Sequence, residues 1–502
     1  MFLVSTVLTD GHVPCIGNPR TMQDKKFKFF TEPYAHQREA FDKSSEQTNY
    51  ALLMDMGTGK TKVTIDTIGL LFEEKKIDIA VVVAPKGVIA NWVAEIETHL
   101  PPRIEREVLL WNPNLTDKVK KSLRALYTKT GKLKFLLMNV EAFSTEKGTD
   151  VAKAFIKMFK AIMVVDESTT IKNRGAQRTI ALCAVGRGAR YRRILTGSPV
   201  TKSPLDLFSQ MGFLDPDILG FKNFYAFQSR YALLDKKHMG ARIFNQVTGY
   251  QRLDELTDKL SKSSFRVRKE DCLDLPDKVY EKREVALTKE QAKAYRQMKQ
   301  LALAQLDNGE LATTHSVLTQ IMRLQQICCG HLTDDDGKIH DLSSNRIESL
   351  LDLCEEVQGK AIIWATWTAD IRSIAEALRS RYSVQAASTL HGETPDSERQ
   401  HIVETFQDRQ SELRFLVGHP KTGGYGLTLT AANTVIYYSN SYDLELRLQS
   451  EDRAHRIGQN NKVTYIDLMS PKTIDEKIVK SLRDKINIAN QILGESAREW
   501  LV

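Results

Sequence analysis

The chain has 502 residues, which is too long for one hydrophobic core and indicates about two to four domains. Hydrophobic residues make up 42% and charged residues 27%, values typical of globular chains, which exclude disordered, collagen-like and fibrous classes. Lys and Arg number 71 against 63 Asp and Glu, so the formal net charge of +8 fits a polyanionic partner and fits plain solubility equally well.

The sequence predicts no membrane segment and no secretion signal. Residues 1–9 are apolar but lack a preceding Lys or Arg and a small-residue cleavage site, so we expect a cytoplasmic protein. The longest apolar stretches, such as residues 77–85, are far shorter than the roughly 18 residues that a spanning helix needs. Six cysteines form no C-x-x-C pair, and Cys328-Cys329 followed by His331 is poor zinc spacing, so we expect buried free thiols and no zinc.

Short β-branched runs alternate with helix-length segments in two separate stretches of the chain. The expected strands of the first stretch are 50–54, 79–84, 134–138, 161–165 and 193–195, and those of the second are 361–365, 414–417, 434–439 and 463–468. A parallel sheet covered on both faces by helices is the natural solution for such alternation. The sequence therefore predicts an α/β protein with two parallel-sheet lobes in tandem and helical insertions between them.

The region between the two stretches contains the predicted domain boundary. After Pro204 the strand signal fades into charged, helix-forming sequence, and the polar residues 333–345 precede the second sheet. Apolar residues at near-helical spacing over 473–493 predict a last helix that packs back on the lobes. The predicted division is an N-terminal extension (1–30), a first lobe (31–205), helical insertions and linker (206–343), a second lobe (344–470) and the C-terminal helix (471–502).

The strongest motif is a glycine-rich loop between a predicted strand and a helix expected over 62–71. It ends Gly57-Thr58-Gly59-Lys60-Thr61, so backbone N–H groups can wrap phosphates, Lys60 can reach the β and γ oxygens, and the Thr61 hydroxyl can hold Mg²⁺. The strict pattern has Gly where Met54 stands. The alternative, a turn that only connects strand to helix, is less favoured with a strand before the loop and a helix after it. The loop predicts a nucleoside triphosphate site.

A second motif places two carboxylates at the end of an apolar run. The run 161–165 ends in Asp166-Glu167, at the carboxyl edge of a buried strand, where α/β sheets bind ligands. Burying two acids without a cation costs several kcal/mol. We therefore assign Asp166 to Mg²⁺ and Glu167 to the attacking water as general base. The alternative is a solvated loop, which becomes less favoured beside an upstream Gly-Lys-Thr.

A third motif lies near the C-terminus, where Arg453 and Arg456 are three residues apart and are expected on one face of a helix. Two guanidinium groups can then point together into a cleft. An arginine supplied to a γ-phosphate accelerates phosphoryl transfer by about 10³- to 10⁵-fold. The alternative is a pair of surface arginines, which would be favoured if the other motifs were missing.

The ordered set of motifs resembles a helicase superfamily two motor of the Swi/Snf type, an ATP-dependent DNA translocase. The similarity runs from about residue 33 to about residue 482, and its most specific part extends from Gly423 to Gln459. The resemblance implies two RecA-like lobes, ATP and Mg²⁺ as cofactors, DNA-stimulated hydrolysis, and a monomer that acts on double-stranded or branched DNA. It also implies that Arg453 and Arg456 are arginine fingers.

The resemblance assigns further residues by position. Gln37 matches the glutamine motif that reads adenine, and Gly426 belongs to the nucleotide site. Four residues match segments that couple hydrolysis to movement: Thr196, Gly197, Ser198 and Gln449. Segments that touch nucleic acid are matched by Pro85, Lys86, Asn139, His391, Gly392, Thr422, Gly423 and Gly424.

The chain departs from the family pattern in two places. The family usually has His at the fourth position of the Asp-Glu motif, where this chain has Thr169 after Ser168. We expect these two hydroxyls to hydrogen-bond toward Thr196. The usual Trp-Asn-Pro is replaced by Ser441-Tyr442-Asp443.

Three alternatives to a translocase remain open from the sequence. A strand-separating DNA helicase, or an RNA helicase, would use the same motifs, although the sequence shows no distinct wedge or hairpin. A non-hydrolysing scaffold that binds nucleic acid would not need the complete set of catalytic residue types. A phosphate-switched signalling NTPase would not need a second sheet with paired arginines. The basic segment 262–269 is either a DNA contact or a solvated helix face.

Overall fold

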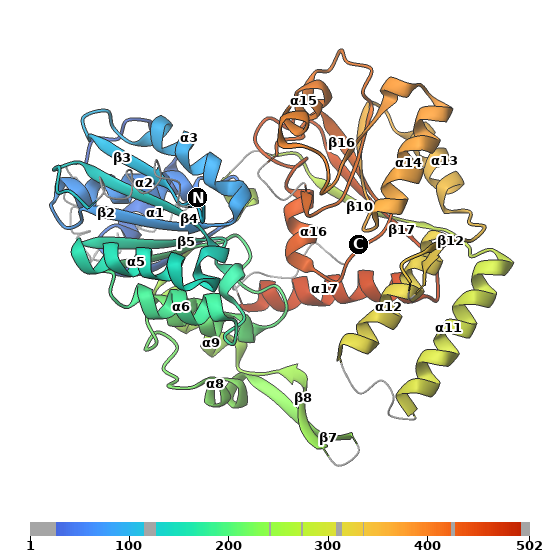
Figure 1. Ribbon diagram of the computed structural model, residues 1–502, viewed down its shortest axis with the longest axis horizontal. Coiled ribbons are helices and arrows are strands. Elements are labelled where there is room, and N and C mark those ends of the chain that lie inside the picture. The colour runs from blue at the N-terminus through green and yellow to red at the C-terminus, as the bar shows by residue number, and fades with distance from the viewer. Residues whose placement is uncertain are drawn as a thin grey trace, which may run out of the picture.

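The computed structural model describes residues 27–114, 127–239, 242–272, 275–307, 314–334, 336–422 and 427–492. Two parallel β-sheets, each covered by helices, form two lobes that lie side by side (Figure 1). Across these ranges, no helix is both long enough and apolar enough to cross a membrane. The predicted fold class, two parallel-sheet α/β lobes in tandem, is confirmed.

The first sheet has seven strands, and all neighbouring strands run parallel. In spatial order they are β3 (Arg106–Leu110), β4 (Leu133–Asn139), β2 (Ile79–Ala84), β5 (Ala161–Asp166), β6 (Tyr191–Leu195), β1 (Asn49–Met54) and β9 (Ser264–Val267). Residues of β2 alternate between the two buried faces: Val81 packs in one core and Val82 in the other. Because both faces are buried, the central strands are continuous apolar runs, which is why the sequence predicted them.

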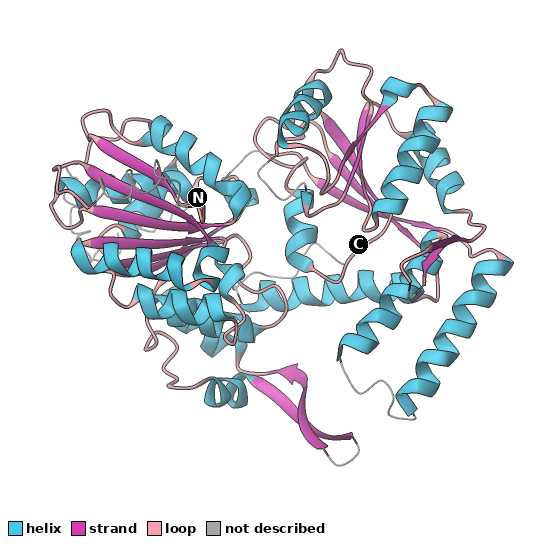
Figure 2. Ribbon diagram, viewed as in Figure 1, coloured by secondary structure: helices cyan, strands magenta, loops and turns pink. Residues whose placement is uncertain are grey.

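Helices cover both faces of the first sheet (Figure 2). On one face lie α1 (Ala35–Ser44), α2 (Lys60–Glu73) and α3 (Ile89–His99). On the other lie α5 (Glu146–Met158), α6 (Gln177–Gly186), α7 (Leu207–Leu214), α8 (Phe224–Tyr231) and α9 (Leu253–Ser261).

The second sheet has six strands, again all parallel. In spatial order they are β10 (Lys278–Glu284), β17 (Val463–Met469), β16 (Ala432–Tyr437), β13 (Lys360–Trp364), β15 (Phe415–Gly418) and β14 (Ala387–Leu390). One face packs against α13 (Arg346–Glu356) and α14 (Thr368–Arg381), and the other against α15 (Asp396–Gln407). The helix α16 (Leu444–Glu451) lies on the side that faces the first lobe (Figure 1).

The segment 206–343, which was expected to hold helical insertions and a linker, contains strands as well. The strand β9 forms an edge of the first sheet, and β10 forms an edge of the second. Between α8 and α9, β7 (Ala232–Met239) and β8 (Arg242–Tyr250) form an antiparallel hairpin that projects away from the first lobe (Figure 1), although the sequence analysis found no hairpin. Edge strands and hairpins are partly exposed, so they lack the continuous apolar run that predicted the central strands.

Three long helices lie outside the two sheet cores. The pair α11 (Lys289–Asp307) and α12 (Thr314–Cys329) is followed by the short strands β11 (His331–Thr333) and β12 (Ile339–Asp341). The last helix, α17 (Ile474–Ile492), contacts α9 of the first lobe as well as α12 and α16. A helix over the predicted 473–493 is therefore present, and it touches both lobes.

A buried ion pair fixes α17 to the second lobe. The Arg346 guanidinium, which is fully buried, lies 2.7 Å from the Asp475 carboxylate and also donates to the carbonyl of Leu468. We expect Arg346→Met to lower the free energy of unfolding of this lobe by about 3–5 kcal/mol, because the Asp475 carboxylate would stay buried without its cation. Thermal melting of the Arg346→Met and Arg346→Met/Asp475→Leu proteins measures this. The second replacement should restore part of the loss, and equal melting of the single variant and wild type would contradict the expectation.

Candidate functional site

The glycine-rich loop joins β1 to α2, as the sequence predicts. Backbone carbonyls at the start of the loop bind the ammonium group of its own lysine, Lys60. Gly57 and Gly59 have φ values of 82° and 93°, a left-handed conformation that glycine adopts without strain. The buried Lys60 ammonium donates to the carbonyls of Met54 at 2.8 Å and Asp55 at 3.2 Å. A bound phosphate would have to compete with these two carbonyls for the lysine.

Two residues of α1 hold the loop from the outside. The Gln37 amide donates to the Thr58 carbonyl at 3.2 Å, and a His36 ring nitrogen lies 2.8 Å from the same oxygen. A Cβ added at Gly59 would lie 2.2 Å from the Gln37 amide nitrogen and would displace this side chain, and the φ of 93° disfavours every residue other than glycine. The structure thus places Gln37, the expected adenine reader, directly against the phosphate loop.

The two acidic residues stand at the carboxyl end of β5, as expected. The Trp92 indole donates to one Asp166 oxygen at 2.8 Å, and the Glu167 backbone N–H donates to the other at 2.9 Å. Burial raises the pKa of Asp166. Burial also raises the pKa of Glu167 to about 7; the cations Lys60 and Arg453 oppose this rise, and Asp166 and Glu445 add to it. The influence of Lys60 on both carboxyl groups shows that the loop and the acids share one site.

The oxygen donors of this site fit Mg²⁺. Asp166 offers a buried carboxylate whose charge is costly without a cation, and the half-buried Thr61 offers a hydroxyl next to Lys60. Carboxylate and hydroxyl oxygens are the hard ligands that Mg²⁺ prefers, and one or two carboxylates with substrate phosphates are its usual set. In the part of the chain that is described, no group of three His, Cys, Asp or Glu side chains could hold a metal alone. An ion here would therefore need the nucleotide's phosphates as well.

Arg453 is brought toward the same site from the second lobe. Burial lowers the pKa of Arg453 to about 10; the charges of Asp452 and Glu167 raise it, and that of Arg456 lowers it further. Arg453 therefore lies within Coulombic range of the Glu167 carboxylate of the first lobe. The expected single helix face is wrong, because α16 ends at Glu451 and residues 452–458 form turns. The two arginines nevertheless lie close together.

Lys269 links the phosphate loop to the arginine segment. Its ammonium lies 2.6 Å from the Asp452 carboxylate and 3.0 Å from the His455 carbonyl, and its backbone N–H donates to Asp55. The Arg266 guanidinium binds the other Asp55 oxygen at 2.7 Å. Segment 262–269 is therefore not a solvated helix face, because it contains the edge strand β9 and the first residue of α10 (Lys269–Cys272). The other alternative, a DNA contact, stays a prediction.

The coupling residues pack against the phosphate loop. A Cβ at Gly197 would lie 3.3 Å from the Asp55 Cα, so this glycine lets the two loops touch. The Thr196 hydroxyl accepts from the Ser198 N–H. The expected bond from Ser168 to Thr196 is wrong: Ser168 donates to the buried Gln210. The Gln210 amide in turn donates to the Pro199 carbonyl, which connects the acidic motif to the coupling segment through one intermediate side chain.

Thr169, at the usual histidine position, also bonds elsewhere. Its hydroxyl donates to the Glu445 carboxylate of the second lobe at 2.5 Å, and not to Thr196. Gln449, one of the expected coupling residues, donates to the same carboxylate at 3.4 Å. The sequence analysis missed Trp92, Gln210, Lys269 and Glu445 as partners in the site.

Comparison with models of known protein families shows the family to which the chain belongs. The model of the SNF2-related domain matches residues 27–332, more than half of the chain, and that of the helicase conserved C-terminal domain matches residues 345–458. The chain belongs to the SNF2 family. The resemblance to Swi/Snf-type helicase superfamily two proteins is confirmed, and with it the class of helicase-type ATPases.

This SNF2-family chain is similar to much longer proteins. The SWI/SNF chromatin-remodeling complex subunit snf22 of Schizosaccharomyces pombe is 26% identical over 467 residues, which cover 89% of this chain and 27% of the relative. The putative ATP-dependent helicase/translocase YwqA of Bacillus subtilis is 26% identical over 460 residues, which cover 89% and 46%. The chain therefore spans less than half the length of either relative.

A solved structure also aligns with this SNF2-family chain. The Sulfolobus solfataricus SWI2/SNF2 ATPase core in complex with dsDNA matches 92% of this chain and 95% of its own, with 24% identity and a TM-score of 0.39.

The residues of this SNF2-family chain that are expected to touch nucleic acid lie at the carboxyl ends of strands. Pro85 and the exposed Lys86 follow β2, and Asn139 ends β4, where it donates to Glu141. In the second lobe His391 and Gly392 follow β14, and Thr422, after β15, donates to the carbonyls of Leu390 and His419. Gly423, Gly424 and Gly426 lie outside the described residues. Both sets follow the carboxyl edge of their sheet, where such folds bind ligands.

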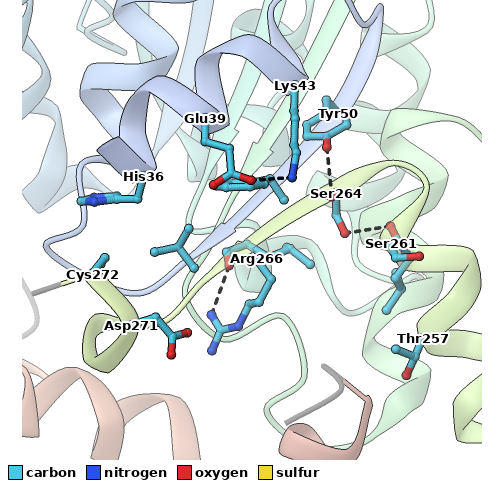
Figure 3. Close-up of a pocket in the computed structure, with 14 residues that line it drawn as sticks. His36, Glu39, Lys43, Tyr50, Thr257, Ser261, Ser264, Arg266, Asp271 and Cys272 are labelled. Carbon is cyan, nitrogen blue, oxygen red and sulfur yellow. Dashed lines mark hydrogen bonds and ion pairs between the residues drawn. The ribbon is translucent and has the colours of Figure 1, made fainter. Parts of the chain in front are cut away.

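A pocket of about 530 Å³ opens between α1, β9 and α10 of this SNF2-family chain (Figure 3). His36, Glu39 and Lys43 of α1 line one side, and Arg266 of β9 and Cys272 of α10 line the other. Glu39 and Lys43 pair with each other at 2.6 Å. Lys60, Asp166 and Glu167 do not line this pocket. The pocket is therefore separate from these catalytic groups.

Proposed function

We propose that the protein is an ATP-dependent motor that moves along double-stranded DNA and whose hydrolysis of ATP is stimulated by DNA. One observation carries the proposal: Lys269, whose backbone N–H donates to Asp55 of the phosphate loop, binds the Asp452 carboxylate of the second lobe at 2.6 Å, directly before the arginine segment. A site built from two lobes changes when the lobes move, so hydrolysis and movement can be coupled.

The chain's own side chains have defined tasks in this proposal. Lys60 leaves the loop carbonyls and binds the β and γ phosphate oxygens, while the N–H groups of residues 57–61 surround them. Glu167 accepts a proton from the attacking water, and a pKa of about 7 suits that task. Arg453 and Arg456 stabilise the charge that spreads over the γ-phosphate oxygens. Mg²⁺, held by Asp166 and Thr61, would neutralise phosphate charge.

DNA would bind along the carboxyl edges of the two sheets. Lys86, Asn139, His391, Gly392 and Thr422 follow these edges. Contacts there would go to phosphates, so affinity should depend strongly on salt and hardly on base sequence. Branched DNA would present the same backbone.

The test is a titration of ATP turnover with duplex DNA, single-stranded DNA, branched DNA and RNA, each at two salt concentrations. We expect the largest stimulation with duplex or branched DNA, and a loss of apparent affinity at the higher salt. Stimulation by single strands or RNA alone would favour a strand-separating or RNA helicase, for which the β7–β8 hairpin would be a candidate wedge. Absence of turnover with every nucleic acid would favour a non-hydrolysing scaffold.

A further inference from the structure

A cluster of three polar side chains joins the acidic motif to the second lobe. The Thr169 hydroxyl donates to one Glu445 oxygen at 2.5 Å, and the Lys172 ammonium lies 3.1 Å from the other. Lys172 also donates to the Thr201 hydroxyl at 2.7 Å. Because one carboxylate receives donors at both oxygens, its position relative to the first lobe is well defined.

On the side of the first lobe, the cluster is attached directly to the catalytic acids. Thr169 lies in the short helix η3 (Ser168–Ile171), which begins immediately after Asp166-Glu167, and Lys172 directly follows this helix. The bond from buried Ser168 to Gln210 holds η3 against α7. A shift of Thr169 would therefore be transmitted to Glu167.

On the side of the second lobe, Glu445 is in the first turn of α16. The Asp443 carboxylate caps this helix by accepting from the N–H groups of Glu445 and Leu446. The chain leaves α16 at Glu451 and reaches Arg453 two residues later. At about 1.5 Å per helical residue, Glu445 lies roughly 10 Å along the helix axis from the start of the arginine segment.

The first lobe thus holds α16 at both ends. Lys269 binds Asp452 just beyond the C-terminal end at 2.6 Å, while Thr169 and Lys172 bind Glu445 at the N-terminal end. Arg447 binds Asp467 at 2.6 Å and so fixes α16 within its own lobe. One attachment to the first lobe would let the whole second lobe pivot, whereas two fix its orientation. The direction of α16 determines where the arginine segment points.

We propose that Thr169, Lys172 and Glu445 form an interlobe clasp, and that Glu445 is a positioning residue that aligns the arginine pair with Asp166 and Glu167. This inference rests on the proposed function, because alignment matters only if the two lobes share one catalytic site. The side chains of Lys172 and Glu445 keep 18% and 20% of their exposure, so water can reach the clasp when the lobes part. The clasp can therefore open and reform during a cycle.

The first experiment measures the distance between the lobes without nucleotide. Spin labels are placed at Met158→Cys on α5 and Val384→Cys on the second lobe, two exposed positions, with Cys15, Cys183 and Cys272 replaced by serine. We expect Glu445→Gln and Thr169→Val to broaden the distance distribution. The control Glu356→Gln breaks an exposed ion pair with Arg283 inside the second lobe and should leave the distribution unchanged. An unchanged distribution in both clasp variants would overturn the proposal.

The second experiment measures ATP turnover of the same clasp variants without labels. Glu445→Gln should lower kcat by about 10- to 100-fold and leave KM for ATP unchanged, because misplaced catalytic groups slow the chemical step while the phosphate loop is intact. Thr169→Ser keeps the hydroxyl, so this variant should hydrolyse ATP at the wild-type rate. The Glu445→Gln/Thr169→Val double variant should be no slower than Glu445→Gln alone, because both changes break the same clasp. An unchanged or raised kcat in Glu445→Gln would overturn the positioning role. If the wild-type protein does not hydrolyse ATP, the proposed function fails, and the distance measurement still decides whether the clasp exists.

Discussion

Arg453→Gln is expected to slow ATP hydrolysis by about 10³- to 10⁵-fold, the range by which an arginine supplied to a γ-phosphate accelerates phosphoryl transfer. Glutamine keeps a polar but shorter side chain and removes the charge that interacts with Glu167. Nucleotide affinity should change little, because the phosphate loop belongs to the other lobe. Single-turnover hydrolysis and fluorescent nucleotide binding measure the two quantities separately.

The matched control is Arg409→Gln, which removes an exposed arginine from the same lobe. It should leave turnover at the wild-type rate. If Arg453→Gln also hydrolysed ATP at the wild-type rate, Arg453 would not be part of the site. If the melting temperature of the Arg453→Gln protein were well below that of wild type, the Arg456→Ala protein would supply the same comparison, since Arg456 is close to Arg453.

Lys60→Ala is expected to bring ATP turnover to background, a loss of at least about 10³-fold. The ammonium now bound by the Met54 and Asp55 carbonyls is the group that would move to the phosphates, and alanine has no replacement for it. DNA binding should stay largely intact, because the expected DNA contacts lie on other loops. Turnover and DNA binding by fluorescence anisotropy measure the two effects, with Lys157→Ala on the exposed face of α5 as control. DNA-stimulated turnover that survived in Lys60→Ala would remove this lysine from the site.

The sequence predicted the central strands because burial on both faces of a sheet requires an apolar side chain at nearly every position of the strand. All six residues of β2 are buried, and they read as one apolar run. The edge strand β10 has the sequence KVYEKRE and no fully buried residue, so its pairing with β17 has no comparable signal. The same reason hid β3, whereas β9 and β14 have only two buried residues each, too few for an apolar run. Without such runs the region between the lobes was predicted as helices.

The catalytic residue types were predictable because each motif is local in the sequence. The partners of these residues were not, because they come from distant segments. Trp92 is 74 positions from Asp166, and Glu445 is 276 positions from Thr169. No periodicity or spacing links such pairs; only the packing of the two lobes brings them together. For the same reason the sequence analysis expected the hydroxyls of Ser168 and Thr169 to bond toward Thr196. In the structure Ser168 donates to Gln210 and Thr169 donates to Glu445.

The central claim is that the first lobe holds the triphosphate and the second lobe completes the site with arginine. A structure of the protein with Mg²⁺, ADP and aluminium fluoride, a mimic of the transferring phosphoryl group, tests it most directly. The account predicts that the Lys60 ammonium and the Arg453 or Arg456 guanidinium both lie about 3 Å from the mimic. A mimic bound by Lys60 with both arginines directed away from it would contradict the account.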